Sequence, residues 1–226
     1  MMSSVPSWLA PYLPQIIAVI LLIPSIVLHE MGHGFAAYKL GDPTAKNAGR
    51  LSFNPARHVD LFGSIILPLA LVAVGGPIIG FAKPVPYDPR YFKNLRQGEV
   101  IVGLAGPAVN FLLALVGSLV CFVGQQIFGA NPVVGYWVFF VGYYFAYINL
   151  MLMFFNLLPI PPLDGSSIIA AFLPNSAMPT YYKIQQYALF VLIILLIVVP
   201  YVAGFNPIGV YIDATAGRLL DIIVPW

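Results

Sequence analysis

Residues 12–38 read YLPQIIAVILLIPSIVLHEMGHGFAAY, an apolar run that ends in two histidines and a glutamate. A helix that spans a bilayer needs about 20 mostly apolar residues, and Glu30 is the only charged side chain in this stretch. A carboxylate and two imidazoles in such a helix are costly unless they have a function. The stretch therefore predicts a first membrane span with a functional site in its C-terminal part.

The composition of the whole chain points to the same class. Of the 226 residues, 60% are hydrophobic and 8% are charged, whereas an average soluble domain has about 25% charged residues. So few charges cannot cover a globular surface, and we predict a polytopic α-helical membrane protein surrounded by the lipid bilayer. The net charge of +2 comes without a basic run, which excludes nucleic acid as a partner.

The beginning of the chain lacks the features of a cleaved leader. No Lys or Arg precedes Lys39, so the basic region of a signal peptide is missing and we expect the first apolar segment to be retained. No polar stretch is long enough for an appended soluble domain, which needs at least about 50 residues. We therefore expect one domain over residues 1–226, in which the single cysteine, Cys121, has a packing role.

Further apolar runs predict a bundle of about four to six transmembrane helices in all. These runs cover 61–81, 99–123, 133–157, 184–203 and, more weakly, 205–226. The first of them is interrupted by Pro68 and broken by Gly75-Gly76-Pro77, which leaves about 14 helical residues, or about 21 Å, for a hydrocarbon core of about 30 Å. We expect this segment to be re-entrant.

The motif at the end of the first span suggests a metal site. On a helix, His29 and His33 stand one turn apart on one face and can bind one Zn²⁺ together. Glu30 projects about 100° away, where it can accept a proton from water on the metal. Catalytic zinc usually has three protein ligands and an open fourth position, so a third ligand is required.

Several residues remain candidates for the third ligand. They are Asp42, His58, Glu99, Asp164, Asp213 and Asp221. Asp164 differs from the others because it follows the fourth apolar run in the segment Asn156–Gly165, whose three prolines prevent the helix from continuing. A carboxylate on an irregular segment at membrane depth is typical of a polar cavity.

Several motifs, taken in order, resemble the site-2 protease family of intramembrane zinc metalloproteases. They are His29-Glu30-x-x-His33, Gly80-Phe-Ala-Lys-Pro-Val-Pro86, Gly106-Pro107-x-x-Asn110, and Asn156 with Leu163-Asp164-Gly165. The resemblance is to the compact prokaryotic branch, without PDZ or CBS domains, which implies a multi-pass protein of a prokaryotic cell membrane. It also implies an endopeptidase that cuts within or near the transmembrane segments of membrane-protein substrates.

The resemblance also implies roles for individual residues. It makes His29, His33 and Asp164 the ligands of one Zn²⁺ per chain, and it makes Glu30 the general base and acid. Asn156 would lie near the scissile carbonyl. Asn110, in the third span, would either support the site or form a simple interhelical hydrogen bond.

Topology can be predicted from the ligand set and from the charges. For His33 and Asp164 to share a metal, the first and fourth runs must point to the same face, which again requires 61–81 to be re-entrant. Eight basic residues then lie on one side, which the positive-inside rule makes cytoplasmic. They are Lys39, Lys46, Arg50, Arg57, Lys83, Arg90, Lys93 and Arg96. The active site is thus expected toward the cytoplasmic side.

Two short segments, Arg50–Pro55 and Phe81–Pro86, bracket the re-entrant part and have extended character. We expect strands there, and the family resemblance implies a small β-sheet near the cytoplasmic face. Its edge could pair with an unwound substrate strand. Two other functions stay open: a divalent-metal transporter, disfavoured because the polar residues cluster at one depth, and a catalytically dead protein that binds membrane clients, disfavoured by the intact Glu30.

Overall fold

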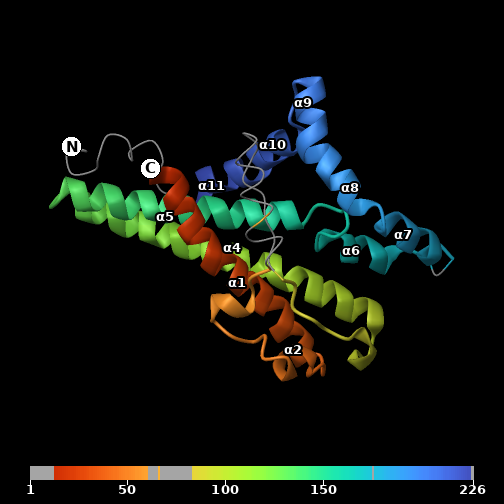
Figure 1. Cartoon of the computed structure of the whole chain (residues 1–226). Helices are drawn as coiled ribbons and strands as arrows, with labels where there is room; N and C mark the ends of the chain where they lie inside the picture. The colour runs from red at the N-terminus through yellow and green to blue at the C-terminus, as the bar shows by residue number, and fades with distance from the viewer. Residues whose placement is uncertain (1–12, 61–65, 67–82, 175, 225–226) are drawn as a thin grey trace.

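The computed structural model describes residues 13–60, 66, 83–174 and 176–224. Figure 1 shows two long helices, α4 and α5, side by side, with α1 crossing them. The helices are α1 (Leu13–Lys39), α2 (Thr44–Asn47), η2 (Pro55–Arg57), η4 (Pro89–Tyr91), α4 (Leu95–Phe128), α5 (Pro132–Asn156), α6 (Gly165–Phe172), α7 (Met178–Gln185), α8 (Ala188–Ile193), η5 (Ile194–Val198), α9 (Val199–Ala203), α10 (Pro207–Ile212), η6 (Asp213–Gly217) and α11 (Arg218–Ile223).

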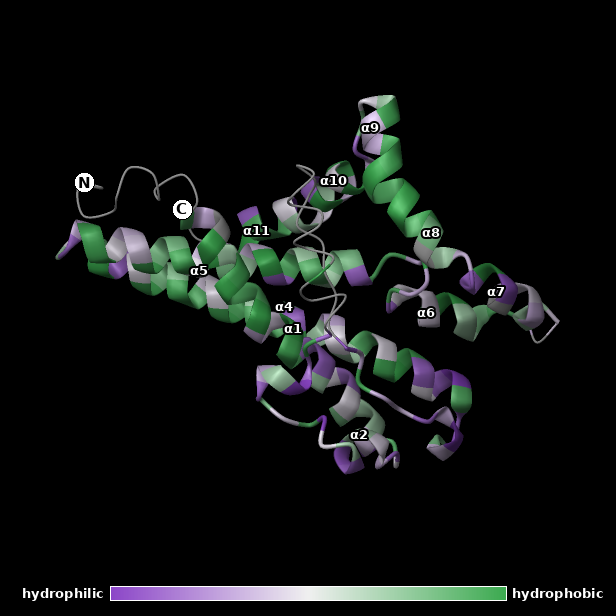
Figure 2. Ribbon diagram, viewed as in Figure 1, coloured by the Kyte–Doolittle hydropathy of each residue, from purple (hydrophilic) through white to green (hydrophobic). Residues whose placement is uncertain are grey.

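Three of these helices are long and apolar enough to cross a membrane, namely Ile16–Lys39, α4 and α5. A fourth crossing is possible if Met178–Gln185 and Phe190–Ala203, which meet at a bend of 54°, form one span. Figure 2 shows hydrophobic residues along these helices and hydrophilic ones around α2 and the start of α4. The helical membrane class is confirmed, whereas a count of four to six spans is not.

The α4–α5 hairpin is held by close backbone contact. A Cβ added to Gly117 would lie 2.6 Å from the Ala146 nitrogen, and one added to Gly142 would lie 2.8 Å from the Gly117 oxygen. Gly124 and Gly135 face each other in the same way nearer the connecting loop. Because small residues let membrane helices approach closely, these glycines determine how α4 and α5 pack.

The first helix runs antiparallel to α4. Moving along α1, His29 contacts Asn110 and His33 contacts Val102, so the partner's number falls as the α1 number rises. Ala37 then packs with Phe92 and Val102 in a small core. The chain therefore leaves α1 and enters α4 at the same end of the bundle, as the re-entrant prediction requires. The fold of 61–81 itself lies outside the described residues, apart from Ile66.

The predicted sheet is not confirmed, because the described part of the chain contains no strand. Residues 50–54 and 83–86 are irregular, and Phe81 and Ala82 lie outside the described residues. The prolines at 84 and 86 have no N–H to donate to a ladder. In the described part of the chain, the Arg50 guanidinium joins the two loops by donating to the carbonyls of Lys83 and Pro84, and it also donates to Arg57 O. Lys83 N donates to His58 O at 2.8 Å.

The C-terminal helices cover one side of the hairpin. Ile212, Ala216 and Leu220 pack with α5 and with Cys121 of α4 in the main apolar core. The Tyr211 hydroxyl donates to Phe154 O at 3.2 Å, which ties the start of this segment to the end of α5. The cysteine is thus buried among apolar side chains, where we expected it.

Candidate metal centre

Three of the predicted ligands lie together where α1 meets the start of α6. His29 Nε2 is 3.2 Å from Asp164 Oδ2, and His33 Nε2 is 3.4 Å from Asp164 Oδ1. The two Nε2 atoms are 3.0 Å apart. One ligand atom from each residue falls within 4.8 Å of the others, which is close enough for all three to contact one metal ion.

The Nδ1 atoms of both histidines point away from this centre. His33 Nδ1 is 2.7 Å from the Val102 carbonyl oxygen, and because a carbonyl only accepts, Nδ1 must donate. His29 Nδ1 is 2.5 Å from Asn110 Oδ1, which makes it a donor too. In the neutral imidazoles both Nε2 atoms then carry lone pairs that face each other and the carboxylate.

With both imidazoles neutral, this arrangement brings three acceptors together with no hydrogen between them. Asp164 Oδ2 is buried and has no hydrogen-bond donor. A buried cluster of two imidazole lone pairs and a carboxylate is unfavourable by itself and is satisfied by a divalent cation. The donor set of two nitrogens and one oxygen fits zinc in a catalytic site.

Helix α4 closes one side of the cluster through a glycine. A Cβ added to Gly106 would overlap both His33 Nε2 and His29 Cε1. The absence of a side chain here lets α4 lie directly against the two rings. In the Gly106-Pro107-x-x-Asn110 motif, the glycine therefore allows α4 to pack against the imidazoles, and Asn110 forms a hydrogen bond with His29.

The segment after α5 brings the carboxylate to the histidines. Pro159, Pro161 and Pro162 stop the helix, and turn hydrogen bonds follow, such as Leu163 N to Ile160 O at 2.9 Å. Asp164 then stands at the N-cap of α6.

Glu30 lies on the same helix as the two histidines and is held by the loop that precedes α4. Its Oε2 accepts a hydrogen bond from Val85 N at 2.9 Å. The neighbouring carbonyls of Lys83 and Pro84 are fastened by Arg50. A carboxylate beside a metal cluster, with its position set by a backbone amide, is suited to proton transfer.

Asn156 does not contact the cluster through any hydrogen bond among the described residues. Its Nδ2 donates to Leu152 O within α5 at 3.0 Å.

Two of the alternative third ligands have other partners: His58 Nε2 is bonded to Ser52 O, and Asp42 accepts from Thr44 N and Asp88 N. Glu99, Asp213 and Asp221 are not part of the cluster either.

Two buried polar residues behind the site were not expected. Asn110 Nδ2 donates to Asn149 Oδ1 at 2.9 Å, and Asn149 Nδ2 donates to Ser25 Oγ at 3.0 Å. The spacing of α5 contains a signal that would have found Asn149, because Gly135, Gly142 and Asn149 follow one another at intervals of seven residues. On α4, Gly103, Asn110, Gly117 and Gly124 repeat at the same interval.

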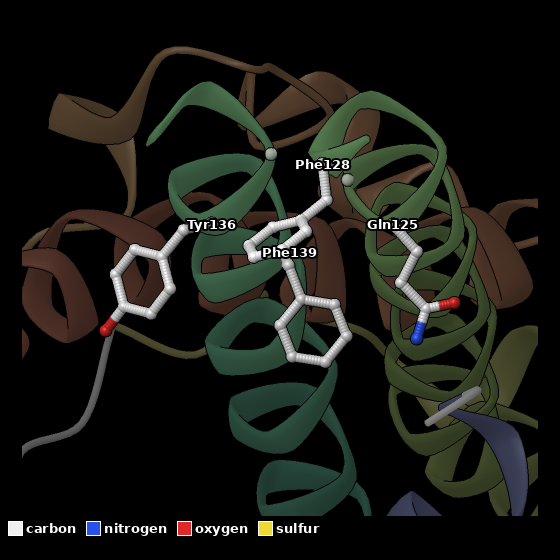
Figure 3. Close-up of a pocket in the computed structure, with 6 residues that line it drawn as sticks. Gln125, Phe128, Tyr136 and Phe139 are labelled. Carbon is white, nitrogen blue, oxygen red and sulfur yellow. The ribbon is translucent and has the colours of Figure 1, made fainter. Parts of the chain in front are cut away.

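An apolar hollow near the α4–α5 loop is distinct from this centre. It is lined by Gly124, Gln125, Phe128, Gly135, Tyr136 and Phe139. In Figure 3 the rings of Phe128 and Phe139 lie between Tyr136 and Gln125. The hollow contains no predicted ligand and lies at the opposite end of the hairpin from Asp164, so it takes no part in the metal chemistry.

The chain is also similar in sequence to known proteins. The profile of Peptidase family M50 matches residues 17–134 and 125–199. The chain is 36% identical to "Putative zinc metalloprotease YwhC" of Bacillus subtilis over 92% of the chain and 86% of the relative. It is 30% identical to "Putative zinc metalloprotease Rip2" of Mycolicibacterium smegmatis, over 89% of the chain and 78% of the relative. No solved structure matches.

Proposed function

Because the chain belongs to peptidase family M50, the site-2 protease family, and is therefore an intramembrane zinc metalloprotease, we propose that His29, His33 and Asp164 hold its zinc ion. The observation that supports this ligand set is the meeting of two imidazole Nε2 atoms, 3.0 Å apart, with a carboxylate whose buried Oδ2 has no hydrogen-bond donor. One such group among the described residues favours one zinc ion per chain.

In the proposed mechanism, this chain's own residues move the protons. A zinc ion at the site would polarise the scissile carbonyl and acidify a water molecule. Glu30, held by Val85 N, accepts the proton from the attacking water and returns it to the leaving amine. Asn156, once its amide turns away from Leu152 O, donates to the developing oxyanion.

The substrates are membrane proteins, and a peptide bond inside a helix is inaccessible until the helix unwinds. We propose that the unwound segment runs beside residues 83–86, whose backbone already reaches Glu30 through Val85 N. Helix-breaking residues near the cleavage site would favour this step. This placement keeps the substrate-pairing role that we expected for a sheet edge and assigns it to an irregular segment.

The distribution of charges supports one orientation in the membrane. The end of α1 and the start of α4 lie together, with Lys39 at one and Arg96 at the other. We propose that this end is cytoplasmic in a prokaryotic cell membrane, that the chain is one domain over 1–226, and that 61–81 is re-entrant.

The test compares the wild type with Glu30→Gln on a panel of single-span substrates in detergent. The amide keeps the shape of the carboxylate but cannot take up the proton, so we expect cleavage to disappear while the zinc content is unchanged. Cleavage by Glu30→Gln above about a hundredth of the wild-type rate would remove Glu30 from the mechanism. Failure of the wild type to cleave any member of the panel would leave the proposed substrate range without support.

A further inference from the structure

We propose that Asn149, supported by Ser25, is a positioning residue of the zinc site: it orients the Asn110 amide so that His29 presents an Nε2 lone pair to the metal. The inference rests on the proposed role of His29 as a zinc ligand. It concerns two residues, on α5 and α1, that touch neither the metal cluster nor the substrate.

The orientation of the Asn149 amide is determined by the partners of its Nδ2 atom, on the side away from Asn110. One amide atom lies 2.9 Å from the Phe145 carbonyl oxygen, which can only accept, so this atom must be Nδ2. The same atom lies 3.0 Å from Ser25 Oγ, whose own hydrogen is donated to Leu21 O at 2.8 Å. Two acceptors therefore hold Nδ2 in place, and Oδ1 must face α4.

The orientation of the Asn149 amide determines that of the Asn110 amide, which in turn determines the tautomer of His29. Because Asn149 Oδ1 only accepts, the Asn110 atom 2.9 Å away is Nδ2, and Asn110 Oδ1 must then face His29. His29 Nδ1, 2.5 Å from that oxygen, must carry the proton. A flipped Asn110 would present N–H groups to Nδ1, move the proton to Nε2 and block the bond to the metal.

Burial leaves no substitute for these bonds. Ser25, Asn110 and Asn149 are completely buried, so water cannot take over the role of a missing partner. The hydrogen-bonded series Ser25–Asn149–Asn110–His29, called the relay below, joins α1, α4 and α5. The hydrogen-bond partners of a metal-binding histidine commonly affect metal affinity by about 10- to 100-fold.

A purely structural role makes a different prediction. Asn110 and Asn149 also lie in the stripe along which α4 and α5 pack, and a buried amide pair can fix the register of two helices. If that were the only role, every substitution of Asn149 would alter stability in step with zinc affinity. Hydrogen-bond direction distinguishes the positioning role from the structural role. An aspartate at position 149 can still accept from Asn110 but has no amide N–H, so it keeps the first bond and loses the others.

The experiment measures zinc affinity of the full chain in detergent, by competition with a chelator, and the thermal stability of the metal-free form. Asn149→Leu removes the acceptor for Asn110, and we expect it to weaken zinc binding by about tenfold or more. Asn149→Asp retains an acceptor and should bind zinc within about threefold of the wild type, although it loses stability. If Asn149→Leu does not fold, Asn149→Ala replaces it.

A double-mutant cycle and two controls complete the design. In an Asn110→Leu background the relay is already cut, so Asn149→Leu should change zinc affinity little further. Ser118→Ala removes a hydroxyl of α4 that donates to Ile223 O, and it should affect stability but not zinc affinity. His29→Ala tests the ligand set separately, since unchanged zinc affinity in that variant would overturn the proposed site itself.

The inference would be overturned by any of three results. Asn149→Leu could bind zinc within about twofold of the wild type, Asn149→Asp could lose as much affinity as Asn149→Leu, or the two leucine substitutions could be additive. If His29→Ala loses zinc while Asn149→Leu does not, the positioning role fails and the proposed function stands.

Discussion

The chemistry of the site depends on where individual hydrogens are. Both Nδ1 atoms donate to fixed acceptors, Val102 O and Asn110 Oδ1, so both imidazoles turn a lone pair to the same point. With the Asp164 carboxylate they form a set of ligands with a charge of about −1, which partly neutralises a divalent ion. The partners of the histidines matter as much as the histidines because they select the tautomer.

Replacing any ligand should remove the metal. We expect His29→Ala, His33→Ala and Asp164→Ala each to lose zinc and cleavage, because two protein ligands hold zinc far more weakly than three. Metal content per chain, measured on purified protein, checks this. His58→Ala is the matched control, since His58 Nε2 is bonded to a loop carbonyl and should not affect the metal. Full zinc occupancy and activity in Asp164→Ala would assign the third ligand to another residue.

Zinc affinity should also depend on the space that Gly106 leaves beside the two imidazoles. Gly106→Ala places a methyl group where His29 and His33 lie, so the rings must move and we expect zinc affinity to fall by about tenfold or more. Gly129→Ala is the control, because no atom lies within 4 Å of the added Cβ there. Equal zinc affinity in the two variants would mean that α4 shifts to make room for the methyl group and does not constrain the ligands.

At the scale of the elements, helix packing and one loop position the site. The glycines of α4 and α5 bring the two backbones together, which places Asn149 within hydrogen-bonding distance of Asn110. The loop of residues 83–86 contributes Val85 N to Glu30, and it is held by Arg50 rather than by a sheet. The proposed general base, Glu30, thus depends on a loop that is held by one buried side chain, Arg50.

Arg50→Lys should therefore reduce the cleavage rate more than it reduces zinc binding. An ammonium group cannot reach three carbonyls as the planar guanidinium does, so the loop shifts and Glu30 loses its partner. We expect about a tenfold lower rate at unchanged zinc content, measured with one substrate in single turnover. The matched control is Arg57→Lys, whose side chain is exposed and donates to Gly49 O. A rate for Arg50→Lys equal to that of this control would contradict the role of the loop.

At the scale of the whole molecule, the antiparallel packing of α1 with α4 and of α4 with α5 determines which ends meet. The C-terminal ends of α1 and α5 lie at the same end of the bundle, which is why Asp164 reaches His29 and His33. Most of the basic residues lie in the segments between α1 and α4, beside that same end. We therefore expect the proposed metal centre to lie close to one membrane face.

Single cysteines should report this topology directly. Lys46→Cys and Arg90→Cys, both at exposed positions, should react with an impermeant reagent from the cytoplasmic side of the membrane. Ala130→Cys, in the loop between α4 and α5, should react from the opposite side, and the native Cys121 is buried. Labelling of positions 46 and 90 from opposite sides would make 61–81 a true span and contradict the shared ligand set.

The sequence by itself determined the class of the protein and predicted the core of its proposed site. Apolar runs longer than a bilayer needs require a helical membrane protein, and the i, i+4 spacing of His29 and His33 puts both rings on one helix face. These conclusions depend on composition and on local periodicity, which need no knowledge of the fold. The motifs added Asp164, and the family to which they point is confirmed.

The tertiary structure decided what depends on residues far apart in the chain. Asn110 is 81 residues from His29, and Asn149 is 124 residues from Ser25, so no local pattern reveals that they meet. The seven-residue repeats on α4 and α5 indicate matching faces, but only the packed register shows which amide faces which. Irregular loops replace the predicted strands in the described residues, because one arginine bridges them where prolines cannot form a ladder. Hydrogen-bond direction, and with it the tautomer of His29, is a property of the assembled helices alone.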